Sequence, residues 1–166
     1  MNIRRLTLMA TLAAAALTIF VAESQIPPVV PLPGIKLGLA NIITLVAMSI
    51  LSRRDAGLIL AVRIILGSIF TGSVSSLIFS LAGGVLAFAV MAAVIGLFPE
   101  KLIWVVSTLG AIGHNTGQLI AAVFVTGTPG ILIYAPALLA SSIITGVFTG
   151  LASMYLIRSF KKIANK

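Results

Sequence analysis

The feature that most constrains how this chain folds is the length of its apolar stretches. Hydrophobic residues make up 60% of the 166 residues, and charged residues only 8%. A soluble domain of this size has too little interior to bury so much apolar surface. A membrane helix, in contrast, needs about 20 mostly apolar residues in a row. We therefore expect an all-α, polytopic membrane protein that forms a single domain over residues 1–166.

Short polar breaks divide the chain into six apolar stretches, which we interpret as six transmembrane helices. The first break carries four prolines between Pro27 and Pro33, a density that forbids a helix. The second and third stretches are near the shortest length that crosses a bilayer, so their ends are the hardest to place. The expected spans are residues 6–22, 35–51, 56–70, 77–97, 102–125 and 131–157.

The basic residues give these spans a direction. Nine of the eleven Lys and Arg residues fall at alternate breaks or at the termini, as the positive-inside rule requires for one side of a membrane. We therefore expect both termini to be cytoplasmic and the chain to lie in the cytoplasmic (inner) membrane. The nine are Arg4, Arg5, Arg53, Arg54, Lys101, Arg158, Lys161, Lys162 and Lys166. The net charge of +8 then fits anionic lipid, and the expected contact is the lipid bilayer with no nucleic acid.

A cleaved signal peptide is an alternative interpretation of the N-terminus. The chain has a basic start, an apolar core and the small residues Ala22 and Ser24 at a suitable distance. Cleavage would leave an odd number of spans, so we favour a retained first helix.

The composition also excludes several kinds of chemistry. There is no cysteine, so disulfides, thiol catalysis and Cys-ligated metals are ruled out. With one histidine and three acidic residues placed apart, we expect no metal site, no cofactor and no catalytic residues. No phosphate-loop motif is present, so the chain is not expected to hydrolyse ATP itself.

Arg63 lies inside the third span, where a charge is costly and is rarely kept without a task. It would be a snorkelling arginine if it bonded to lipid headgroups, but its mid-span position weakens that interpretation. No span contains an acidic partner for it, because Asp55 and Glu100 are expected inside and Glu23 outside. An uncompensated cation that faces a cavity suits an anionic ligand.

Lys36 and Asn41 lie at the outer end of the second span. Lys36 is an ordinary interfacial lysine, paired with Glu23, or a second cation for the same ligand. The positive-inside rule disfavours lysine on the outer side, which favours the second interpretation. Asn41 is expected five residues deeper on the same helix, where a buried amide needs a partner such as a ligand or another helix.

The fifth span holds the densest polar group, His114, Asn115 and Gln118. Their spacing of three and four residues predicts that one helix face presents all three. The glycines Gly113 and Gly117 allow close approach of another helix. Polar contacts between helices are the alternative role, above all for Asn115. With Lys36, Asn41 and Arg63, these groups predict a pocket in the outer half of the membrane, above which residues 23–34 are a candidate lid.

At these residues the sequence resembles the Gx transporter family, long labelled heptaprenyl diphosphate synthase component I. The resemblance covers nearly the whole chain and is carried by four blocks. These are residues 33–41, Arg63 with Leu66-Gly67-Ser68, residues 80–91 from Ser80-Leu81-Ala82-Gly83-Gly84 to Met91, and His114-Asn115-Thr116-Gly117-Gln118.

That family is similar to the substrate-binding S components of energy-coupling factor transporters. The resemblance implies six helices, cytoplasmic termini and an outer pocket for a small anionic substrate, such as an isoprenoid or quinone precursor or a vitamin. It also implies a membrane coupling subunit and two ATPase subunits as partners, with Ala10 and Ala14 as part of the docking face. Alanine is common in membrane helices, so the same face is also open to a plain structural explanation.

Two other functions remain open. The older family label suggests an enzyme, but prenyl diphosphate synthesis needs clustered aspartates that hold magnesium, and this chain has no such pair. It would therefore be at most a non-catalytic membrane accessory of the synthase. A scaffold or pore without a ligand is the third possibility, and it predicts that Arg63 and His114 are replaceable.

Overall fold

The computed structural model describes residues 3–26 and 36–164, and this part of the chain is helical, without strands. The prediction of an all-α fold is confirmed. The elements are α1 (Ile3–Glu23), α2 (Asn41–Ile50), α3 (Arg53–Thr71), α4 (Val74–Val94), η1 (Glu100–Leu102), α5 (Ile103–Thr126), η2 (Pro129–Tyr134) and α6 (Ala135–Ala164), where η marks a 3-10 helix. Within the described residues, three stretches are long and apolar enough to cross a membrane, namely Ile3–Glu23, Val74–Val94 and Pro129–Ile163.

The polar breaks of the sequence act as helix caps. Ser52 accepts a hydrogen bond from the backbone N–H of Asp55 at 3.1 Å and so begins α3, and Ser73 does the same for Ser76 at the start of α4. Gly72 and Gly127 end α3 and α5 with φ of 61° and 63°, a left-handed conformation that favours glycine. The breaks therefore fix the turns, and α1, α3, α4 and α5 lie within about three residues of the expected spans. Helix α6 ends seven residues beyond its expected span of 131–157.

The second span is the exception, and its predicted helix over residues 35–51 is wrong in its first part. Helix α2 begins only at Asn41 and has 10 residues, while residues 36–40 are not helical. Gly38 has φ of 79°, which interrupts the helix. The backbone N–H groups of Gly38 and Leu39 donate to the Glu23 carboxylate at the end of α1. Lys36 and Asn41 are therefore not on one helix.

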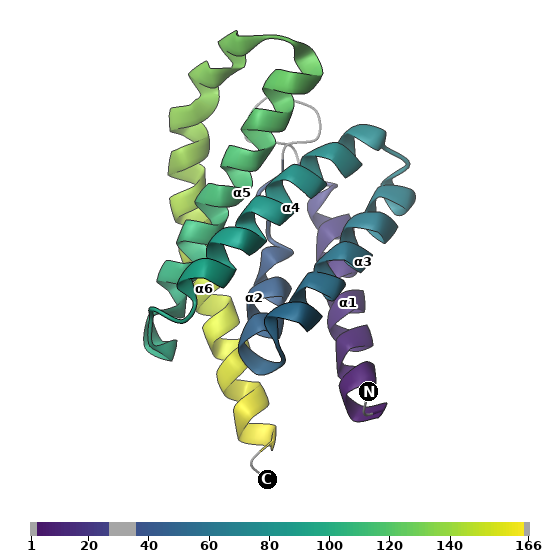
Figure 1. The fold of residues 1–166 in the computed structure, drawn as a ribbon, viewed down its shortest axis with the longest axis vertical. Helices are drawn as coiled ribbons and strands as arrows, with labels where there is room; N and C mark the ends of the chain where they lie inside the picture. Colours follow the sequence, from purple (N-terminus) through teal and green to yellow (C-terminus); the bar gives the residue numbers. More distant parts are fainter. Residues whose placement is uncertain (1–2, 27–35, 165–166) are drawn as a thin grey trace.

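The six helices form a bundle around α2, which contacts each of the other five. Figure 1 shows α5 and α6 as a long antiparallel pair, with α4 crossing them and α1 and α3 on the opposite side. Both chain ends lie at the same end of the bundle, with the α2–α3 and α4–α5 connections towards that end. Helix α2 is buried on nearly every side, and its apolar side chains form the centre of the main core.

Glycines allow α5 to approach its two neighbours closely, as the sequence predicts for Gly113 and Gly117. A Cβ atom added to Gly117 would lie 2.4 Å from the carbonyl oxygen of Ala82 on α4. On the other side, Gly146 and Gly150 of α6 pack directly on the α5 backbone. Backbones this close hold α4, α5 and α6 as one layer, and this layer supports the polar residues of α5.

Candidate functional site

A cluster of polar residues surrounds a closed space in the interior of the bundle. Four elements and the segment before α2 contribute to it, and only Lys36 among its members is partly exposed. The space has no room for a water molecule in this conformation. We call this set the polar cluster: Phe20, Glu23, Lys36, Gly38, Arg63, Ser80, His114 and Gln118.

Arg63 comes from the middle of α3 and is 2% exposed. Its Nε and Nη2 atoms are buried and have no hydrogen-bond partner. A snorkelling arginine would instead reach out of the bundle, so that interpretation does not fit this side chain. A buried guanidinium with unpaired donors is unfavourable unless something else pairs with it.

Glu23 corrects the prediction that Arg63 has no acidic residue near it. We expected Glu23 in the outer loop, but it is the last residue of α1, is 4% exposed and belongs to the polar cluster. Its two oxygens accept the N–H groups of Gly38 and Leu39 at 2.5 Å and 3.0 Å. The carboxylate thus satisfies backbone groups that the interrupted helix leaves free.

Lys36 lies at the partly exposed edge of the cluster, and it contacts residues of three helices. Its ammonium group is 3.5 Å from the ring centroid of Phe20 on α1 and donates to Ser76 on α4 at 3.1 Å. Its backbone N–H donates to the Gln118 side chain on α5 at 3.2 Å. Arg63 lies 5.7 Å from the same Phe20 ring, so one aromatic ring serves two cations.

His114 and Gln118 share one face of α5, as their four-residue spacing predicts, and both lie in the cluster. Both ring nitrogens of His114 and Nε2 of Gln118 are buried without a partner. Glycines border the imidazole on two sides, because a Cβ atom at Gly38 or at Gly83 would lie 2.8 Å from it. The ring is therefore held in place by packing, and its nitrogens are left free.

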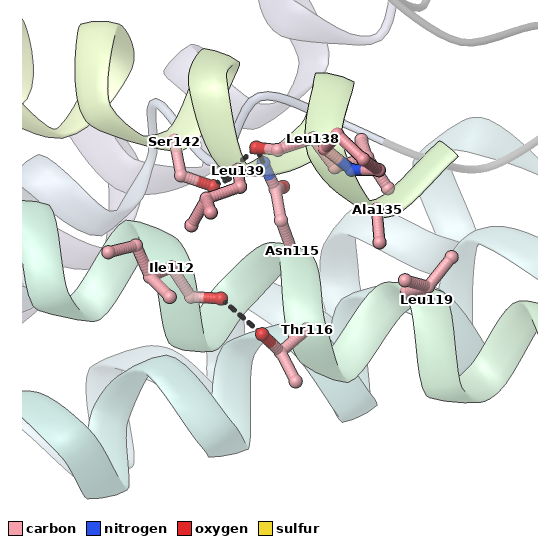
Figure 2. Close-up of a pocket in the computed structure, with 9 residues that line it drawn as sticks. Ile112, Asn115, Thr116, Leu119, Ala135, Leu138, Leu139 and Ser142 are labelled. Carbon is pink, nitrogen blue, oxygen red and sulfur yellow. Dashed lines mark hydrogen bonds between the residues drawn. The ribbon is translucent and has the colours of Figure 1, made fainter. Parts of the chain in front are cut away.

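Asn115 does not share that face, so the prediction that one face presents all three polar residues is wrong. Figure 2 shows its side chain directed to α6, where Nδ2 donates to the Leu138 carbonyl at 3.0 Å and to Ser142 at 2.8 Å. Consecutive helix positions lie about 100° apart, so His114 and Asn115 have to face different neighbours. Asn115 lines a separate groove of about 400 Å³ between α5 and α6.

Asn41 is buried next to the cluster but does not line the closed space. Its Nδ2 atom would lie 3.0 Å from a Cβ atom at Gly38, and its Oδ1 atom has no partner. Four of the six predicted site residues thus meet in the cluster, namely Lys36, Arg63, His114 and Gln118. Asn41 adjoins it, and Asn115 lies apart.

Sequence reasoning missed four members of the cluster, Phe20, Glu23, Gly38 and Ser80. A phenylalanine and a serine in apolar spans carry no signal of their own. Glu23 did carry one, because it is the only acidic residue near the expected outer end of the spans. Most of the predicted lid, namely residues 27–34 of 23–34, lies outside the described residues.

The remaining predicted residues, Ala10 and Ala14, are exposed on α1. They alternate with Thr7, Thr11 and Thr18, whose hydroxyls donate to carbonyls of their own helix. This face of α1 therefore consists of small side chains, and its threonine hydroxyls are already hydrogen-bonded to the helix backbone. Among the residues that the structure describes, no three His, Asp or Glu side chains gather as metal ligands would.

As a chemical unit, the cluster combines two cations, one engaged carboxylate and several free hydrogen-bond donors, which suits an anion. The sequence model of one protein family, described as heptaprenyl diphosphate synthase component I, matches residues 12–156. No curated protein and no solved structure matches the chain.

Proposed function

The chain belongs to the heptaprenyl diphosphate synthase component I family, and from this premise we propose that it is the substrate-binding membrane subunit of an uptake transporter. Its ligand is a small, partly apolar anion, such as an isoprenoid or quinone precursor or a vitamin. The observation that supports this most is Arg63, a buried arginine with unpaired donors inside the polar cluster.

In this proposal the chain crosses the cytoplasmic membrane six times, with both termini in the cytoplasm. Large apolar side chains such as Phe70, Phe124 and Phe148 are more than half exposed, as lipid contact would require. The end of the bundle that carries both termini in Figure 1 also carries the exposed basic residues. Lys36, the partly exposed member of the polar cluster, then lies on the outer side.

Energy for uptake has to come from partners, because the chain has no phosphate loop. We propose a membrane coupling subunit with two ATPase subunits, docked on the small-residue face around Ala10 and Ala14. Small residues let two membrane helices approach closely. On this account the chain is not an enzyme.

Purification of the tagged chain from its native host in mild detergent, followed by mass spectrometry of the co-purifying proteins, tests the partners. We expect a coupling subunit and two ATPases. The double variant Ala10→Leu/Ala14→Leu should lose them, while Ala137→Leu/Ala140→Leu, on an exposed face of α6, should retain them. Retention by both variants would contradict docking at Ala10 and Ala14.

The family description supports a second candidate, a non-catalytic membrane accessory of heptaprenyl diphosphate synthase. Recovery of a soluble prenyl synthase in place of a coupling subunit and ATPases would favour it. Arg63→Ala separates both candidates from a ligand-free scaffold, because a scaffold would keep its cellular function in this variant.

A further inference from the structure

Arg63 leaves one complete edge of its guanidinium free. The unpartnered atoms Nε and Nη2 lie on the same side of the planar group, the edge that holds two anionic oxygens at once. Because the side chain is 2% exposed, solvent does not satisfy these donors. Buried donors without an acceptor cost free energy, so a bound ligand that supplies acceptors to Nε and Nη2 would be favoured.

A second arginine of this chain shows that such an edge binds a carboxylate. Arg5 of α1 donates through Nε at 3.1 Å and through Nη2 at 2.6 Å to the same oxygen, Oδ2, of Asp55 on α3. At Arg63 the nearby carboxylate of Glu23 is already engaged by the backbone of Gly38 and Leu39. Among residues 3–26 and 36–164, no matching group therefore pairs with this edge of Arg63.

The net charge of the cluster limits the charge of the ligand group that can pair with Arg63. Lys36 and Arg63 bring two cations to the cluster. We assign Glu23 as an anion because both of its carboxyl oxygens accept backbone N–H groups, which leaves a single net positive charge. A third cation beside these two in a closed space is unfavourable, so the His114 ring is neutral. Buried charge is stabilised when it is compensated. A ligand with one negative charge compensates the cluster, whereas a diphosphate would leave excess buried negative charge.

The free donors match a carboxylate in number. Arg63 offers two N–H groups, Gln118 offers its amide nitrogen, and the neutral His114 ring offers one N–H. A carboxylate has about four lone-pair sites on its two oxygens. A neutral alcohol has fewer acceptor sites and no charge to offer.

We infer that the ligand carries a single carboxylate, held by Nε and Nη2 of Arg63, with Gln118 and His114 donating to its remaining lone pairs. This inference rests on the proposed function, since it takes the polar cluster as the place where the ligand is held. It also requires the cluster to open, because the closed conformation has no room even for a water molecule. It deepens that function by naming the substrate class, which is partly apolar monocarboxylic acids in preference to prenyl diphosphates.

The test compares four probes with the same tail: geranic acid, geranyl phosphate, geranyl diphosphate and geraniol. Their binding to the purified full chain in lipid nanodiscs is measured by isothermal titration calorimetry near neutral pH. We expect geranic acid to bind about tenfold or more tightly than geranyl diphosphate, because only the acid balances the buried charge. Geraniol should bind most weakly.

Two variants test the geometry and the charge separately. Arg63→Lys keeps the positive charge but removes the pair of parallel N–H donors of the guanidinium. The affinity for geranic acid should therefore fall about tenfold or more. Arg54→Lys, the same change at an exposed position of α3, should leave it unchanged. Glu23→Gln adds one net positive charge and should shift the preference towards geranyl phosphate and geranyl diphosphate. The unfolding temperature of each variant without probe shows whether it still folds.

The outcomes separate this inference from the proposed function. Tighter, Arg63-dependent binding of geranyl diphosphate would overturn the carboxylate and leave anion capture in place. A folded Arg63→Lys variant that binds geranic acid as tightly as the parent would also overturn it. If Arg63 affects the binding of none of the four probes, the capture of partly apolar anions falls as well.

Discussion

Gly83 of α4 leaves no space for a methyl group against α5. A Cβ atom there would lie 2.8 Å from the His114 ring and 2.9 Å from Gln118 Cγ. The ring cannot move away, because Gly38 borders it on the opposite side equally closely. We expect Gly83→Ala to destabilise the folded chain by about 1–3 kcal/mol, as overpacking does, measured as a lower unfolding temperature in detergent.

Gly57 of α3 provides the matched control. A Cβ atom there would meet only Phe88, at an ordinary contact distance of 3.5 Å. Gly57→Ala should therefore be neutral or stabilising by up to about 1 kcal/mol, because alanine favours a helix over glycine. Equal effects of the two substitutions on stability would show that α4 and α5 can make room for a methyl group at position 83.

Residue by residue, the sequence identified those site members whose polarity is out of place in an apolar span. Arg63, His114 and Gln118 are conspicuous in this way, and Lys36 conflicts with the charge rule. Glu23 was assigned to the wrong environment, because nothing in the sequence shows that its carboxylate turns inward to bind the backbone before α2. That contact depends on two segments meeting in space.

Among the elements, α2 shows the limit of apolar length as a predictor. The apolar run from residue 35 onward predicts a continuous helix, but glycine at position 38 and the Glu23 carboxylate make an interrupted one more stable. Non-helical backbone at such a place is tolerated where protein surrounds it. The ends of α3 and α4 were predictable to within about three residues, since serine and glycine caps act locally. Helix α6 continues seven residues past its predicted end.

The contact between α5 and α6 depends on Asn115, and we expect it to be structural. Asn115→Ala removes the bonds to Leu138 and Ser142 and should cost about 0.6–2 kcal/mol, the usual range for polar contacts between membrane helices. Its unfolding temperature should fall, while its affinity for geranic acid stays unchanged. Gln118→Ala should do the reverse and weaken binding more than stability. Loss of binding in a folded Asn115→Ala variant would return this residue to the ligand site.

At the scale of the whole molecule, the natural absence of cysteine makes the topology directly measurable, because every introduced thiol reports only its own position. Ser75 is exposed in the first turn of α4, Thr128 is exposed between α5 and η2, and Lys101 is exposed in η1 before α5. With six spans and cytoplasmic termini, a membrane-impermeant maleimide should label Ser75→Cys and Thr128→Cys in intact cells. It should label Lys101→Cys only after lysis. Labelling of Lys101→Cys alone in intact cells would show the opposite orientation and place Lys36 on the cytoplasmic side. Capture from outside requires Lys36 on the outer side, so that result would contradict uptake through the polar cluster.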